Sequence, residues 1–211
     1  MLHVMTTGRA TSSVDTILIQ FKFKTFDPTY EKALHQAAVG LQKLQKSLMS
    51  IGFKKEQLKT TKFDVKTKYE LVKVKTGSDE QKRQFIGYEV IHEMNLKFPF
   101  DMTRLSEVVR VIVGSGVPVE FNINFLVDDQ EALENAALRD ACLKAKTQAK
   151  TLAESLEVTL KGIAEISTKE HYHMYQDRQY DLNYSMAAEQ MMDIQPDDVS
   201  VEMAVTVKYH I

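Results

Sequence analysis

The feature that most constrains this sequence is a strict two-residue alternation of apolar and polar side chains. Over residues 199–211, apolar side chains fill every odd position and polar ones fill most even positions. Successive side chains of a β-strand point to opposite faces of a sheet, so this period predicts a strand with one buried face. The same alternation recurs in four other segments, which are 16–25, 63–71, 86–96 and 119–127. Two shorter strands are expected over 2–7 and 162–169.

Three segments between these strands have apolar residues at helical spacing instead. Residues 30–51 form an apolar stripe of about six turns that ends before Gly52, a typical helix-ending residue. A second stripe covers residues 105–112 and is followed by a Gly-Ser-Gly sequence. The third helix has its predicted stripe at Leu138, Cys142, Ala145, Ala149, Leu152 and Leu156. In that stripe Cys142 is expected to be a small buried side chain rather than a reactive thiolate.

The predicted elements follow one another in the order β-β-α-β-β-α-β-α-β-β. Their inner part, residues 16–127, has the β-α-β-β-α-β order of the ferredoxin-like split βαβ motif. The sequence therefore predicts an α+β fold, with a largely antiparallel sheet whose one face is covered by helices. A length of 211 residues suits a single domain, 1–211, and two packed halves, 1–98 and 99–211, are the alternative organisation.

Several stretches, in their order along the chain, resemble one known family. The matching stretches are Thr7-Gly8 with Val14-Asp15-Thr16, Leu48 to Thr61, Gly87-Tyr88, Phe121 to Asp129, Leu138 to Leu156, and Ile194 to Tyr209. Together they resemble the SIMPL domain family, which is named for a mammalian protein associated with a pelle-like kinase and is mostly bacterial. Two positions depart from the family pattern. Val14 replaces an entry proline, and Glu157 replaces the glycine that usually follows the long helix.

The resemblance implies a protein with no agreed enzymatic activity and no functional residue that can be carried over. Some exported bacterial relatives form ring-like homo-oligomers, some are linked to stress resistance, and the mammalian relative is an adaptor. Many bacterial relatives carry a signal peptide. Residues 1–9 show no basic stretch followed by an apolar one, so we expect a cytoplasmic protein.

Composition narrows the class of protein further. Apolar residues make up 44% of the chain and charged residues 27%, which is typical of a folded globular protein. A single cysteine excludes a disulfide scaffold, and no apolar run is long enough to span a bilayer. The chain has no Gly-x-Ser-x-Gly turn, phosphate-binding loop or dinucleotide-binding glycine motif. We therefore expect a non-enzymatic protein without catalytic residues or cofactor.

Two closely spaced histidines are the only hint of a metal site. His171 and His173 would lie on the same side of a strand, where Asp177 or His210 could join them. The competing interpretation is a solvated strand end that enters a loop. Metal sites rarely lack further ligands nearby, so we expect no metal here and keep these residues as weak candidates.

Charge is distributed unevenly along a chain whose net charge is only -2. Residues 54–83 carry ten lysines and arginines against five acidic residues, whereas residues 171–202 carry one arginine against seven acidic residues. The basic segment lacks interleaved exposed aromatic residues and the chain is not basic overall, so no nucleic acid is expected. A solvated hairpin face is one interpretation. Charge complementarity between subunits is the other.

The segment 171–195 is longer than most loops and rich in the residues of adaptable contact surfaces. Its predicted interaction residues are Tyr172, Tyr175, Tyr180, Tyr184, Met186 and Met191. A mobile surface loop is the competing interpretation. Our leading prediction is a SIMPL-type protein that self-assembles into a homo-oligomer, with this segment and the lysine-rich hairpin at the contacts. The alternatives are a monomeric or dimeric module that binds a protein or peptide, and a metal-binding protein or enzyme that uses His171 and His173.

Overall fold

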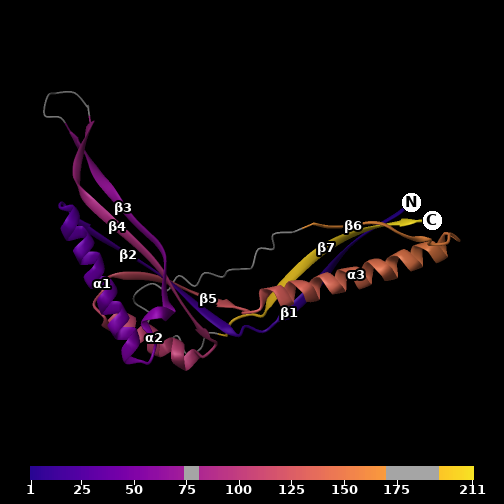
Figure 1. The fold of residues 1–211 in the computed structure, drawn as a ribbon, viewed down its shortest axis with the longest axis horizontal. Coiled ribbons are helices and arrows are strands. Elements are labelled where there is room, and N and C mark those ends of the chain that lie inside the picture. Colours follow the sequence, from indigo (N-terminus) through magenta and orange to yellow (C-terminus); the bar gives the residue numbers. More distant parts are fainter. Residues whose placement is uncertain (74–80, 170–194) are drawn as a thin grey trace. The chain divides into compact units, whose positions relative to one another are not determined.

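The structure is a computed structural model that describes residues 1–73, 81–169 and 195–211 (Figure 1). Its elements are β1 (Leu2–Ser12), β2 (Thr16–Asp27), α1 (Tyr30–Ser50), the 3-10 helix η1 (Lys55–Gln57), β3 (Leu58–Lys73), β4 (Gln81–Pro99), α2 (Met102–Gly114), β5 (Val119–Leu126), α3 (Gln130–Ser155), β6 (Gly162–Lys169) and β7 (Val199–His210). Apart from η1, the described elements follow the predicted order. The predicted α+β class with antiparallel sheets is confirmed.

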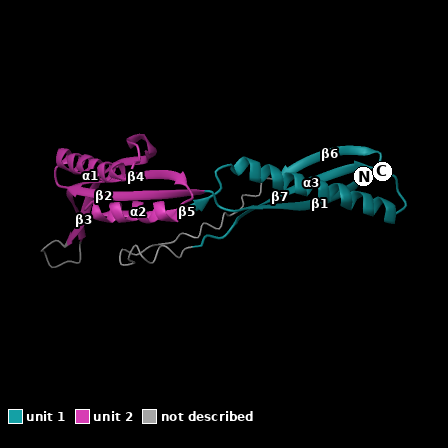
Figure 2. Ribbon diagram, turned by 90° about the horizontal axis from the view of Figure 1, so that it is seen from below, with its two compact units in different colours: residues 1–15, 125–178, 195–211 teal, residues 16–124, 179–194 magenta. Residues whose placement is uncertain are grey.

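The described residues fall into two compact units (Figure 2). One unit holds the described residues within 16–124, and the other combines residues 1–15, 125–169 and 195–211. The boundaries differ from a division near residue 98, because β1 pairs along its whole length with β7 from the far end of the chain. One unit is therefore an insertion between two parts of the other.

The inserted unit contains the ferredoxin-like arrangement. Its sheet has the strand order β3-β4-β2-β5, and β4 runs antiparallel to both β2 and β3. The strands β2 and β3, which α1 connects, are thus separated by β4, as the split βαβ motif requires. The predicted buried face of β2 is confirmed, since Ile17, Ile19, Phe21 and Phe23 are all buried.

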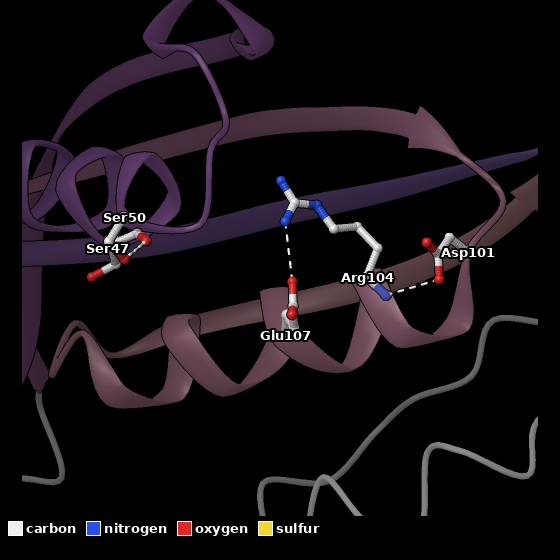
Figure 3. A network of polar contacts seen from close by, with 5 residues as sticks. All are labelled: Ser47, Ser50, Asp101, Arg104 and Glu107. Atoms are coloured by element: carbon white, nitrogen blue, oxygen red, sulfur yellow. Dashed lines mark hydrogen bonds and ion pairs between the residues drawn. The ribbon is translucent and has the colours of Figure 1, made fainter.

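Arg104, near the start of α2, contacts Asp101 and Glu107 (Figure 3) and also packs on Phe53, which follows α1. The Asp101 carboxylate accepts a hydrogen bond from the Arg104 backbone N–H at 3.0 Å and thereby caps α2. The Arg104 guanidinium lies 4.5 Å from the ring centre of Phe53, just after α1, and donates to Glu107 at 3.0 Å. These contacts fix the two helices against each other on the covered side of the sheet.

The other unit is a three-stranded antiparallel sheet in the order β1-β7-β6, with α3 packed on β1 and β7. The predicted apolar stripe of α3 is correct at Ala145 and Ala149, which are buried, and at Leu152, which packs against the core, but not at every position. Cys142 and Leu156 are exposed, and the buried stripe repeats every fourth residue. Its members are Leu133, Ala137, Ala141, Ala145, Ala149 and Ala153.

A close approach between α3 and β1 explains the difference in the first half of this helix. A Cβ atom on Gly8 would lie only 2.1 Å from the Ala137 carbonyl oxygen and from the Ala141 backbone nitrogen. The backbone of the helix therefore rests almost directly on the strand at Gly8, where the buried stripe has the alanines Ala137 and Ala141. A larger side chain at either position would hold the helix away from the sheet.

Candidate functional site: an aromatic ribbon on the β3–β4 hairpin

The site residues predicted from the sequence lie outside the described residues. They are the metal candidates His171, His173 and Asp177, and the interaction candidates Tyr172, Tyr175, Tyr180, Tyr184, Met186 and Met191. Their roles stay predictions. Within residues 1–73, 81–169 and 195–211, no group of three or more His, Cys, Asp or Glu residues is placed to hold a metal ion.

The described surface with the most distinctive chemistry is the outer part of the β3–β4 hairpin. β3 has 16 residues and β4 has 19, whereas their neighbour β2 has only 12. β2 ends at Asp27, which pairs with Tyr88. Beyond that point β3 and β4 pair only with each other among the described residues, and Figure 1 shows them extending past the sheet. We call residues 68–73 and 81–87 the ribbon.

The base of the ribbon is fixed at Gly87. This residue has a φ of 151°, and a Cβ there would lie 2.6 Å from the Asp27 carbonyl oxygen and 2.7 Å from the Pro28 Cα. Glycine thus allows β4 to touch the turn between β2 and α1. Next to it, the rings of Tyr88 and Tyr30 pack edge to face with centres 5.3 Å apart. The ribbon therefore starts from a well-packed point of the fold.

A ladder of aromatic rings continues from this base along one face of the ribbon. The ring of Phe85 lies 5.3 Å from Tyr88 and 5.8 Å from Tyr69, both in edge-to-face geometry. Such pairs each contribute about 0.5–1.5 kcal/mol beyond area burial. Tyr69 is 48% exposed, Phe85 44% and the neighbouring Leu71 64%. We call Tyr30, Tyr88, Phe85 and Tyr69 the aromatic ladder.

Cations lie beside these rings. The Arg83 guanidinium is 5.5 Å from the ring centre of Tyr69, and the Lys68 ammonium is 5.7 Å from that of Phe26. Lys68 also donates to the Glu89 carboxylate at 2.8 Å, and this hydrogen bond lowers the pKa of Glu89 below its ordinary value. Lys82 adds a further cation to the ribbon, and Glu70 adds one carboxylate. The ribbon is therefore both apolar and positively charged.

This arrangement corrects the sequence analysis, which found no exposed aromatic residues interleaved with the lysines. Phe63 and Tyr69 on β3 are each 48% exposed, and Phe85 on β4 follows the two cations Lys82 and Arg83. The alternation pattern assigned Phe63 and Tyr69 to a covered face. Tyr69 and Phe85 are exposed because β3 and β4 extend beyond the end of β2, the strand that pairs with β4.

One buried histidine of the hairpin was not singled out by sequence. His92 is 3% exposed, and its Nε2 shares a hydrogen bond of 2.9 Å with the Thr60 hydroxyl. Its ring lies between Phe23 and Phe63, with ring centres 5.2 and 5.1 Å away. Burial lowers the pKa of His92, so the ring is neutral at pH 7. This environment suits a core side chain that stabilises the hairpin.

A comparison with known families tests the resemblance that the sequence motifs indicated. The family model for SIMPL, described as a protein of unknown function (DUF541), matches residues 2–209. The chain belongs to the SIMPL family. The assignment predicted from the sequence is confirmed over nearly the whole chain. No curated protein matches this SIMPL protein. Among the described residues, no helix is long and apolar enough to cross a membrane.

Proposed function

We propose that this SIMPL protein acts by binding, without catalysis of its own, and assembles with copies of itself through the ribbon. The aromatic ladder supports this proposal, because Tyr69, Leu71 and Phe85 present contiguous apolar surface that the described fold does not cover. Tyrosine, phenylalanine and arginine are the residue types enriched at protein interfaces, and Arg83 stacked on Tyr69 combines two of them.

The charge of the ribbon supports a partner that carries acidic residues. The sequence itself has such a region, since residues 171–202 hold seven acidic residues and one arginine. Charge complementarity of this kind speeds association and selects partners, and it is screened by salt. A second copy of this chain supplies both signs of charge.

The chemistry of the sheet favours a protein partner over nucleic acid. RNA-binding modules with a four-stranded sheet stack bases on aromatic side chains of the open sheet face. Here that face presents Glu89 and Glu93 on the central strand β4, paired with Lys68 and Lys22. The centre of this face therefore carries ion pairs where those modules carry aromatic rings, and the exposed rings of the ribbon lie at the edge of the unit instead.

The proposal is tested by the absolute mass in solution, measured by light scattering over a range of protein and salt concentrations. We expect the wild-type mass to correspond to an oligomer and to fall as salt rises. The double variant Tyr69→Ser/Phe85→Ser removes the exposed rings and should lower the mass to that of a smaller species. The matched control is Met49→Ser/Val113→Ser, which removes two side chains that are 53% and 51% exposed on α1 and α2.

Three results would contradict the proposal. One is a wild-type monomer at every protein and salt concentration, which would favour a peptide-binding module instead. Another is an oligomer that withstands the ribbon substitutions while circular dichroism shows both variants folded. If the ribbon variant and the control lose the same mass, exposed apolar residues promote assembly wherever they lie on the surface. That result also excludes a specific ribbon interface.

A further inference from the structure

The strand β1 is an edge that lacks the usual protections against pairing. Edge strands are normally blunted by bulges, lysines or short length. Of the described edges, β3 has two register shifts and many lysines, β6 has a shift after Ile163, and β5 has only eight residues. β1 pairs with β7 over eleven consecutive positions without a shift. On its other side no described strand is paired with it.

Two hydrogen bonds show which backbone groups of β1 point outward. The Arg9 N–H donates to the Asp140 carboxylate at 2.9 Å, and the Thr7 carbonyl accepts from the Lys144 ammonium at 3.3 Å. The N–H and C=O of one residue point to the same side in an antiparallel strand, and the sides alternate. The odd residues therefore face outward. Because the Asp140 carboxylate occupies the edge at Arg9, the stretch left for pairing is centred on Met5. The Thr7 carbonyl belongs to this stretch once the Lys144 ammonium, which also pairs with Asp140 at 2.7 Å, turns away from it.

A groove whose lining includes the apolar side chains of Met5 and Leu143, together with Lys144 and Gln148, lies beside this stretch. It has a volume of about 600 Å³ and runs between Met5, Thr6 and Thr7 of β1 and the flank of α3 at Leu143 and Thr147. Met5 is 58% exposed and Leu143 is 65% exposed, although both belong to regular elements. An open strand edge beside an uncovered apolar helix flank is the arrangement in which a further strand adds to a sheet.

We propose that two copies of this protein join by antiparallel pairing of their β1 strands, centred on Met5, into one six-stranded sheet. This inference rests on the proposed self-assembly and adds an interface separate from the ribbon. Met5 would face Met5 of the second copy, and His3 would face its Thr7. All of these are outward-pointing residues, so each facing pair can exchange two backbone hydrogen bonds.

The position of α3 favours a second copy over a free peptide. Each α3 lies over β1 and β7, so the two helices of the pair would be separated by two strand spacings, about 9–10 Å. That distance matches the 8–10 Å between packed helices. The flank of each α3 that carries Leu143 and Thr147 would then cover the same flank of the other copy across the β1–β1 interface. A lone peptide has no helix of its own to cover Leu143.

The charges on the two helices are also compatible with this pairing. Strand and helix rise about 3.3 and 1.5 Å per residue, and Gly8 rests on Ala137 and Ala141. Met5 is therefore level with roughly residue 145 or 146 of α3. A two-fold axis at Met5 brings Asp140 of one helix level with Lys150 of the other. The pairing thus places opposite charges near each other.

Cysteine cross-linking in the full-length protein tests this register. In a Cys142→Ser background, which removes the single native thiol, Met5→Cys should form a disulfide-linked dimer with copper phenanthroline as oxidant. Facing residues that exchange both hydrogen bonds have Cα atoms about 5.5 Å apart, within the range that a disulfide spans. A mixture of His3→Cys and Thr7→Cys proteins should cross-link much more than either protein alone. Thr11→Cys, on the same strand, is the control, and it should remain monomeric on a non-reducing denaturing gel.

Two results would overturn β1 pairing. One is no cross-linked dimer from a folded Met5→Cys protein, and the other is equal cross-linking of Thr11→Cys. Leu143→Glu adds a second readout, since it should abolish the Met5→Cys cross-link, whereas Ile166→Glu on β6 should not. The ribbon variant reports on the proposed function separately. A mass that falls in Tyr69→Ser/Phe85→Ser, without any Met5→Cys cross-link, excludes only the β1 interface.

Discussion

At the scale of single residues, Glu157 stores strain at the end of α3. Among the described residues it is the only one besides glycine with a positive φ, at 54°. The following N–H, of Val158, donates to the Ala153 carbonyl at 3.0 Å and closes the helix. This left-handed position is where the family pattern has glycine. The resemblance therefore identified a real backbone requirement that this chain meets with a less suitable residue.

Replacing this residue should stabilise the protein. We expect Glu157→Gly to raise the free energy of unfolding by about 0.5–1 kcal/mol, because relief of left-handed strain outweighs the added freedom of the unfolded chain. Urea denaturation followed by circular dichroism measures the change. The reverse comparison is Gly52→Ala, at a φ of 91°, which should destabilise the protein. A lower stability of Glu157→Gly would show that the glutamate side chain itself stabilises the turn.

His92 should make stability depend on pH. Burial lowers its pKa below the ordinary 6.5, so the unfolded chain binds a proton more readily than the folded one. The contribution of the neutral ring is thus complete above about pH 6.5 and is lost as the pH falls below that value. Urea midpoints at pH 7.5 and pH 5 should differ less in His92→Phe than in the wild type. The exposed His35→Gln is the control, and an unchanged pH dependence in His92→Phe would refute the argument.

At the scale of elements, the contact between α3 and β1 depends on Gly8. Ala at this position would push its Cβ into the helix backbone, and neither element can move without opening the alanine stripe. We expect Gly8→Ala to lower the free energy of unfolding by about 3 kcal/mol, the upper end of the usual cost of overpacking. Gly114→Ala is the matched control, because a Cβ there has no described atom within 4 Å. Similar unfolding midpoints for the two variants would mean that the helix can lift off the strand freely.

Single elements also show how much of the fold and of the candidate site could be predicted from the sequence. Alternation identified the strands and the buried face of β2, since a residue period of two has one structural interpretation. It failed at Tyr69, because the pattern records which side chains share a face and not where the covering helix ends. The first half of the α3 stripe was misplaced for a related reason, whereas Ala145 and Ala149 were placed correctly. Hydrophobicity favoured Leu138 and Cys142, whereas the close approach at Gly8 selects alanines, and a contact between distant segments leaves no local signal.

At the scale of the whole molecule, the division into units follows from pairing between the chain's two end regions. β1 and β7 form one sheet, so everything between Asp15 and Phe125 is inserted as a unit with its own core. Local patterns predicted every strand involved but not this pairing. The predicted candidate site fell on residues 170–194, outside the described residues, so sequence and structure nominate different parts of the chain for contacts.

The insertion predicts that residues 16–124 fold alone. Their sheet and helices bury Phe21, Leu44, Met94 and Leu105 completely within the unit. The two points at which the chain passes from one unit to the other lie close together. The Asp15 N–H donates to the Leu126 carbonyl at 3.1 Å, and the Asp15 carboxylate accepts from the Asp128 N–H at 2.8 Å. We expect the isolated 16–124 fragment to unfold cooperatively in urea. The remainder, with a short Gly-Ser linker replacing the insert, should retain helical circular dichroism and the Met5→Cys cross-link. A fragment without a cooperative transition would show that the units stabilise each other and that the ribbon and β1 interfaces cannot be studied apart.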